Sequence, residues 1–126
     1  MFDILYIDHD STHRDKTVAM ITALGYELLS TSDCHSGQEI LNKRLPRLVI
    51  IDSSVPSGYD FGTYIHKHPR TAAVPIAYIA DHSGSEGLQQ CIAHKGAFCL
   101  SRPLTPHSLK LALGSLLHRK ESTPPG

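Results

Sequence analysis

Five short apolar runs, separated by stretches with helical patterning, constrain the fold of this chain more than any other feature. None of the runs alternates strictly between apolar and polar residues, as a strand with one exposed face would. Unalternated runs of this length are typical of strands that helices cover on both faces. The runs are Ile4–Ile7, Glu27–Leu29, Leu48–Ile51, Pro75–Ile79 and Ala97–Leu100.

Helix start and stop signals fall between these runs. Asp10 or Ser11 can cap a first helix that Gly25 would end. Ser36-Gly-Gln-Glu39 has the form of a capping box and predicts the start of a second helix. Thr105-Pro106 offers a cap and a first-turn proline for a last helix. Apolar residues at helical spacing mark the third, fourth and fifth helices: Phe61, Tyr64 and Ile65; Leu88, Cys91 and Ile92; and Leu109, Ala112, Leu113, Leu116 and Leu117.

The order of these elements predicts an α/β fold, a single (βα)5 domain with a doubly wound, five-stranded parallel sheet. Crossovers between parallel strands are right-handed, so helices cover both faces of such a sheet. The 126 residues of the chain suit one domain with one hydrophobic core. We assign residues 1–119 to this domain and expect residues 120–126, which are rich in proline, to form a flexible tail or linker stub.

Charge and cysteine content argue against several classes of protein. Lys plus Arg and Asp plus Glu number 12 each, so nothing marks the chain as a binder of nucleic acid or of an anionic membrane. The three cysteines, Cys34, Cys91 and Cys99, form no CxxC motif and suggest no paired framework, as expected in a reducing compartment. No signal-peptide pattern or long apolar stretch is present, and we therefore expect a cytoplasmic protein.

Two of the predicted strands lead directly into carboxylates. Asp52 follows the run Leu48–Ile51, and Asp8-His9-Asp10 follows the run Ile4–Ile7. The carboxyl ends of parallel strands meet at one edge of the sheet, which is where open α/β folds place their ligands. We therefore predict a cation or phosphate site at this edge.

Four segments, taken in their order and spacing, resemble a known family over nearly the whole chain. They are Ile4-Leu-Tyr-Ile-Asp-His-Asp10, Leu48-Val-Ile-Ile-Asp-Ser-Ser-Val-Pro56, Gly58-Tyr-Asp-Phe61 leading to Pro69-Arg-Thr71, and Gly96-Ala97 leading to Arg102-Pro103. Each alone is a weak signal, and together they are specific. The chain resembles the receiver domains of bacterial two-component response regulators, the CheY-like superfamily.

This resemblance implies a set of site residues. The sheet order would be 2-1-3-4-5, as in the flavodoxin/CheY-like fold, and Asp52 would be the phosphoacceptor. Asp8, Asp52 and the backbone carbonyl of Ser54 would hold Mg²⁺, which suppresses repulsion between the carboxylate and the phosphoryl group. Arg102 occupies the position of the family's phosphoryl-neutralising lysine, and the Arg102–Pro103 bond is expected to be cis.

The chain departs from the family pattern at four positions. His9 replaces the second acid of the acidic pair, and since imidazole is a poor Mg²⁺ ligand, we expect weak metal binding for which His9 and Asp10 are doubtful ligands. Ala80 replaces the switch Thr or Ser. Its methyl group cannot make the hydrogen bond to a charged group, worth ~1.5–3 kcal/mol, which is as large as a typical allosteric coupling of roughly 1–3 kcal/mol. Cys99 replaces the switching aromatic residue, and Arg102 keeps the charge of lysine but not its compact geometry.

These observations predict a signalling module rather than an enzyme, with no chemistry beyond autophosphorylation and autodephosphorylation at Asp52. A sensor histidine kinase or phosphotransfer protein would supply the phosphoryl group. The downstream protein would bind the face formed by the fourth helix, the fifth strand and the fifth helix. The alternative is a pseudo-receiver, a binding module that works without phosphorylation.

Two further alternatives are compatible with parts of the sequence. Asp8-His9-Asp10-Ser11-Thr12 matches the DxDxT pattern of haloacid-dehalogenase-like phosphatases, with Asp8 as nucleophile and Asp10 as general acid. Such enzymes need a further acidic motif and a lysine after later strands, where this chain offers Asp52, Asp81 and Arg102. A flavodoxin-like cofactor binder shares the predicted fold but requires a phosphate-binding loop after the first strand, where this chain has acids.

Overall fold

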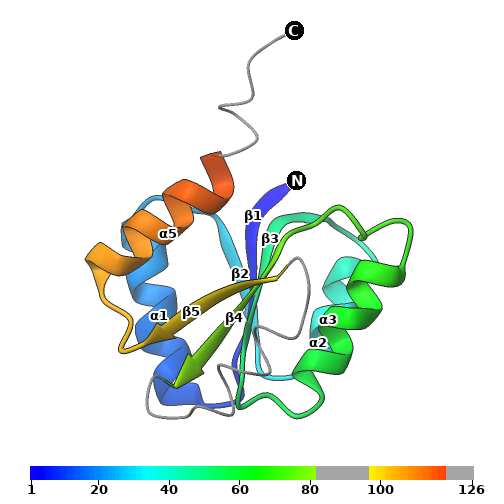
Figure 1. The fold of residues 1–126 in the computed structure, drawn as a ribbon, viewed down its shortest axis with the longest axis horizontal. Helices are drawn as coiled ribbons and strands as arrows, with labels where there is room; N and C mark the ends of the chain where they lie inside the picture. Colours follow the sequence, from blue (N-terminus) through cyan, green and yellow to red (C-terminus); the bar gives the residue numbers. More distant parts are fainter. Residues whose placement is uncertain (82–96, 119–126) are drawn as a thin grey trace, which may run out of the picture.

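The computed structural model of the chain describes residues 1–81 and 97–118 (Figure 1). The described elements are the strands β1 (Phe2–Ile7), β2 (Leu28–Thr31), β3 (Pro46–Asp52), β4 (Ile76–Asp81) and β5 (Phe98–Arg102), and the helices α1 (Ser11–Ala23), α2 (Cys34–Leu41), α3 (Gly58–Lys67) and α5 (Pro106–His118). The predicted fourth helix, with Leu88, Cys91 and Ile92, lies outside these residues.

The five strands form one parallel sheet in the order β2-β1-β3-β4-β5. Ile7 at the end of β1 is in register with Thr31 of β2 and with Ile51 of β3. The predicted strand order and the flavodoxin/CheY-like architecture are therefore confirmed. This register brings the residues that follow Ile7 and Ile51 to the same edge of the sheet.

Helices cover both faces of the sheet, α1 and α5 on one side and α2 and α3 on the other (Figure 1). Successive residues of a strand point to opposite faces, and β1 divides its apolar side chains accordingly. Ile4 and Tyr6 pack in the same cluster as Ile21 of α1 and Leu113 of α5. The other face of the sheet packs against α2 and α3, and its cluster contains Leu5, Ile7, Leu41, Phe61 and Ile65. Burial on both faces explains why the strand runs are apolar without alternation.

The helix starts agree with the sequence patterns in two cases and differ in one. Asp10 caps α1, and Thr105 caps α5 through a reciprocal pair of hydrogen bonds with Ser108, each of 3.0 Å. The prediction that Ser36 begins the second helix is wrong, because α2 begins at Cys34 and Asp33 is its cap. The Asp33 carboxylate accepts a hydrogen bond of 2.8 Å from the Ser36 amide, which occupies the third position of the helix.

The cysteines also differ from expectation. Cys99 is disulfide-bonded and Cys34 is a free thiol, so the prediction that no cysteine is paired is wrong for Cys99. Within the described residues, no helix combines the length and apolar character needed to cross a membrane.

Candidate functional site

Three side chains that are distant in sequence meet at the carboxyl edge of the sheet. Asp8 follows β1, Asp52 ends β3, and Arg102 ends β5. The Arg102 guanidinium forms an ion pair with Asp52, and its Nη2 atom lies 3.5 Å from Oδ2 of Asp8. Asp8 is 0% exposed and Asp52 is 2% exposed, so both carboxylates depend on protein groups rather than on water for their stabilisation.

Ser54 and Arg102 together satisfy both oxygens of Asp52. The Ser54 amide donates a hydrogen bond of 3.0 Å to Oδ2, and the Ser54 hydroxyl donates to the same oxygen. Arg102 donates to Oδ1. The turn that follows β3 places Ser54 for these bonds, because its backbone folds back on the strand end with the Val55 amide bonded to the Asp52 carbonyl at 3.0 Å.

Asp8 is held by donors from three parts of the chain. The Asp10 amide donates to Oδ1 at 3.0 Å, and both Tyr6 and Arg102 donate to Oδ2. Arg14 of α1 donates to the Asp8 backbone carbonyl at 2.7 Å, which fixes the chain where it leaves β1. The Tyr6 hydroxyl also forms a hydrogen bond with Thr17, another buried polar side chain of α1.

Sequence patterns alone do not identify Tyr6 as a site residue, because it lies within an apolar run. A signal for it was present. Tyr6 and Asp8 are two residues apart along a strand and so share a face of the sheet. A tyrosine at that spacing before a buried carboxylate can place its hydroxyl against the acid.

The electrostatics of this cluster follow from its burial. Burial alone would lower the pKa of Arg102, but the negative charges of Asp52 and Asp8 and the hydrogen bond to Asp52 raise it above its ordinary value. Burial and the hydrogen bond to Asp8 raise the pKa of Tyr6. Arg102 therefore remains a cation and Tyr6 remains a neutral donor at physiological pH.

The residues present do not fit a bound Mg²⁺ in this arrangement. All four carboxylate oxygens of Asp8 and Asp52 already accept hydrogen bonds from the chain. His9 is exposed, and the Asp10 carboxylate accepts from the amides of Thr12 and His13 at 2.9 and 3.1 Å, where it caps α1. Among residues 1–81 and 97–118, no group of three or more His, Cys, Asp or Glu side chains could hold a metal ion.

The two predicted switch positions lie on the neighbouring strands β4 and β5. Ala80 is 2% exposed near the end of β4, and its methyl group cannot donate a hydrogen bond. Cys99 is exposed on β5, in register with Tyr78, and its sulfur is held in a disulfide. Ala80 has no hydroxyl group and Cys99 has no aromatic ring, which are the groups that the family resemblance implies at these positions.

The Arg102–Pro103 peptide bond is cis, as expected from the resemblance.

The phosphatase interpretation loses support from this geometry. Its proposed nucleophile, Asp8, is fully buried with both oxygens hydrogen-bonded. Its proposed general acid, Asp10, is a helix cap, and the hydrogen bond from the His13 amide lowers its pKa. A carboxyl group with a lowered pKa is a poor proton donor at neutral pH.

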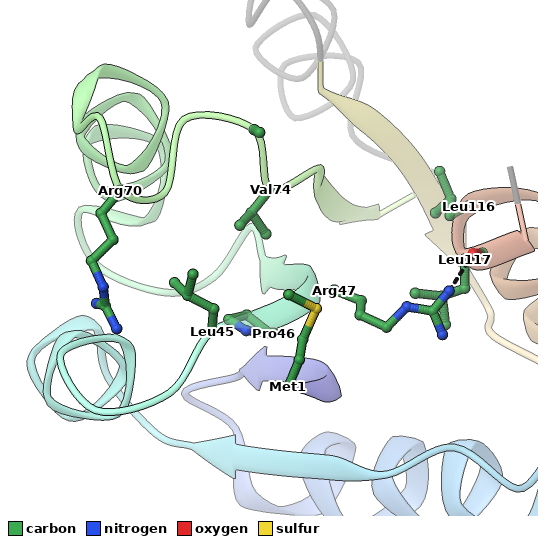
Figure 2. Close-up of a pocket in the computed structure, with 9 residues that line it drawn as sticks. Met1, Leu45, Pro46, Arg47, Arg70, Val74, Leu116 and Leu117 are labelled. Carbon is green, nitrogen blue, oxygen red and sulfur yellow. Dashed lines mark hydrogen bonds between the residues drawn. The ribbon is translucent and has the colours of Figure 1, made fainter. Parts of the chain in front are cut away.

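A separate cavity of about 180 Å³ lies at the opposite end of the strands, where Met1, Pro46 and Leu117 line it (Figure 2). Its two arginines already have partners in the protein. Arg47 donates to the Leu117 carbonyl at 2.8 Å, and Arg70 donates to the Leu41 carbonyl. The cavity thus brings no polar groups together for catalysis.

Comparisons with known proteins point to one group. No family model matches the chain. It is 25% identical over 122 residues to the sensor histidine kinase RcsC of Salmonella typhi, covering 95% of this chain and 13% of that protein. It is 22% identical over 118 residues to the phosphate regulon transcriptional regulatory protein PhoB of Pseudomonas aeruginosa, covering 92% of this chain and 52% of that protein. The chain therefore spans at most about half the length of these relatives.

Solved structures of receiver domains share the fold. A response regulator receiver domain protein from Clostridium thermocellum is 26% identical, with a TM-score of 0.82 and coverage of 96% of this chain and 98% of that one. The receiver domain of a signal transduction histidine kinase from Syntrophus aciditrophicus is 17% identical, with a TM-score of 0.85 and coverage of 98% and 96%. The receiver domain of a Pseudomonas aeruginosa sensor histidine kinase, 18% identical with a TM-score of 0.82 and coverage of 92% and 97%, has a magnesium ion coordinated in its active site cleft. The strand order, the two carboxylates at the sheet edge and these likenesses agree, and together they support a CheY-like fold of the response regulator receiver type.

Proposed function

We propose that this chain is a receiver module of a two-component signalling pathway whose output is a protein–protein contact that does not require phosphorylation of Asp52. One observation carries the proposal. Every oxygen of the two buried carboxylates accepts at least one hydrogen bond from the chain itself, and Arg102 bridges the two groups. The site is thus stable without a phosphoryl group and poorly prepared to accept one.

Phosphoryl transfer to Asp52 would first require an oxygen of that carboxylate to be released. Oδ1 is bonded to Arg102, and Oδ2 accepts both the amide and the hydroxyl of Ser54. An incoming phosphoryl group would also be repelled by the Asp8 carboxylate, since the described residues include no group of three or more metal-binding side chains that would hold a cation firmly against its charge. These costs predict slow or absent phosphorylation.

The signal expected from phosphorylation would also be weak. In this chain, Ala80 cannot donate a hydrogen bond to a phosphoryl oxygen, a contact worth about 1.5–3 kcal/mol. A typical allosteric coupling is about 1–3 kcal/mol. The loss of this one bond is therefore large enough to uncouple phosphorylation of Asp52 from a conformational change at the output face.

A second candidate function is inefficient phosphorylation of Asp52 by a sensor histidine kinase or phosphotransfer protein. The supporting observation is the position of Asp52, which ends β3 at the sheet edge with the Arg102 guanidinium beside it. That guanidinium can neutralise charge on a phosphoryl group. Asp8, Asp52 and the Ser54 carbonyl would be the metal ligands in this case, with weak binding because His9 replaces an acid. In neither case do we expect turnover of other substrates.

The partner would dock on the face that includes β5 and α5. Leu111 of α5 is 61% exposed and lies among the polar exposed residues of that helix. An apolar side chain at this place suits a protein partner better than a charged ligand.

The test uses acetyl phosphate with Mg²⁺, followed by the intact mass and the amide NMR spectrum, with Asp52→Asn as the control. The proposal predicts unchanged mass, unchanged amide shifts near Asp52, and unaltered signalling when Asp52→Asn replaces the wild type in its host. An added phosphoryl mass that Asp52→Asn abolishes would contradict the proposal and support the second candidate. Turnover of a small phosphomonoester that Asp8→Asn abolishes would instead support the phosphatase interpretation.

A further inference from the structure

We infer that the Arg102 guanidinium, assisted by the Tyr6 hydroxyl, is a built-in replacement for the metal ion, so that the site binds a divalent cation much more tightly when the charge at position 102 is removed. This inference deepens the proposed function, because it concerns the same site. It makes Arg102 and Tyr6 the residues that determine how tightly metal binds.

The first argument is the position of the positive charge. Nη2 of Arg102 bonds to Oδ1 of Asp52 and lies 3.5 Å from Oδ2 of Asp8. A single nitrogen therefore bridges two carboxylates from different strands. Two buried carboxylates next to one another need a cation between them, since an unpaired buried charge is strongly destabilising. Arg102 supplies this cation, and because it is part of the chain its presence does not depend on the concentration of free metal ions.

The second argument is that both oxygens of Asp8 already accept hydrogen bonds from the chain. Oδ2 accepts the Tyr6 hydroxyl, and Tyr6 is 0% exposed and bonded in turn to Thr17 on α1. Oδ1 accepts the Asp10 amide at 3.0 Å. Mg²⁺ requires oxygen ligands at about 2.0–2.1 Å in nearly octahedral geometry. A cation could reach such geometry only by displacing the tethered guanidinium from both carboxylates.

The third argument is the lack of a competing acid among the described residues. His9 is exposed and carries no negative charge, and the Asp10 carboxylate is engaged by two amides at the start of α1. Binding of a divalent ion would therefore give the ion two carboxylate ligands, but the two carboxylates would lose their contacts with Arg102. Removing the guanidinium would favour binding of the ion, because the two buried carboxylates would then lack a cation.

The experiment compares wild type with Arg102→Gln, and uses Arg47→Gln as a matched control. Arg47 also pairs with an aspartate, Asp3 at 3.4 Å, but at the opposite end of the sheet. Thermal unfolding is measured in EDTA and in Mg²⁺. We expect the wild-type Tm to be the same in both. Arg102→Gln should unfold at a lower temperature in EDTA and recover in Mg²⁺, whereas Arg47→Gln should be destabilised without recovery.

Mn²⁺ provides a second readout that does not depend on stability. Paramagnetic broadening of the amides of Asp10 and Ser54 should appear in Arg102→Gln at cation concentrations at least roughly tenfold lower than in wild type. Tyr6→Phe, which keeps the ring and the guanidinium, should bind Mn²⁺ with an affinity between those of wild type and Arg102→Gln. If Arg102→Gln fails to fold, wild type and Tyr6→Phe still provide the comparison.

Several results would overturn the inference. Stabilisation of wild type by Mg²⁺, equal broadening in wild type and Arg102→Gln, or a folded Arg102→Gln that gains no cation binding would each do so. Failure of the proposed function is distinguishable, since it appears as phosphorylation of wild-type Asp52 in the mass measurement. Cation binding is measured without any phosphoryl donor.

Discussion

Replacing Tyr6 by Phe removes one hydroxyl from the centre of the site and leaves the packing of the ring unchanged. Tyr6 is fully buried, and its hydroxyl donates to Oδ2 of Asp8. A hydrogen bond to a charged group contributes about 1.5–3 kcal/mol. No solvent screening reduces this value here, since Asp8 is also fully buried. Thr17 loses a partner in the same substitution. We therefore expect Tyr6→Phe to lower the free energy of unfolding by about 1.5–3 kcal/mol.

Urea unfolding at neutral pH measures this effect, and a double-mutant cycle assigns it. The cycle consists of wild type, Tyr6→Phe, Asp8→Ala and the double variant. The coupling energy between the two substitutions should account for most of the loss in Tyr6→Phe, because both remove the same contact. A coupling energy below about 0.5 kcal/mol, or a Tyr6→Phe variant as stable as wild type, would refute the view that this hydroxyl stabilises the buried carboxylate.

Three further predictions concern the other face of the sheet. A Cβ atom at Gly62 would lie 1.7 Å from the Tyr78 hydroxyl oxygen, so Gly62→Ala should lower the free energy of unfolding in urea by about 1–3 kcal/mol. The control Gly114→Ala should be neutral or stabilising, because a Cβ atom there would have nothing within 4 Å. Burial raises the pKa of Tyr78 to about 12. The unfolded state ionises first, near pH 10, so the stabilisation contributed by the Tyr78 hydroxyl should be complete below pH 10 and decline between pH 10 and 12. Thermal unfolding measured against pH should show a smaller loss of stability over this range in Tyr78→Phe than in wild type. Burial and the charge of Asp33 raise the pKa of the Cys34 thiol, so alkylation at pH 8 should be slower in the folded than in the urea-unfolded protein, and a rate equal in both would contradict this.

Local sequence patterns were sufficient for the strands and for most helix starts. The five apolar runs predicted strands because burial on both faces removes the need for alternation, and β1 to β5 contain or overlap them. The start of α2 did not follow from the capping box at Ser36–Glu39, because Asp33 caps the helix three residues earlier. In the structure, Gly37 packs against Ile7 so closely that a Cβ would lie 2.8 Å from its Cδ1. Only glycine at position 37 allows this close approach of α2 to β1.

Local residue patterns were enough to locate the strands approximately, to identify the carboxylates that follow them, and to indicate the family resemblance. That Arg102 bridges Asp8 and Asp52, and that Tyr6 donates to one of them, emerges only in the folded protein. The two kinds of feature differ in the sequence range of the interactions that create them. Helix caps and strand periodicity depend on neighbours within a few residues, whereas the bridge joins the ends of β1, β3 and β5, whose spacing exists only after the crossovers have placed β4 between the last two.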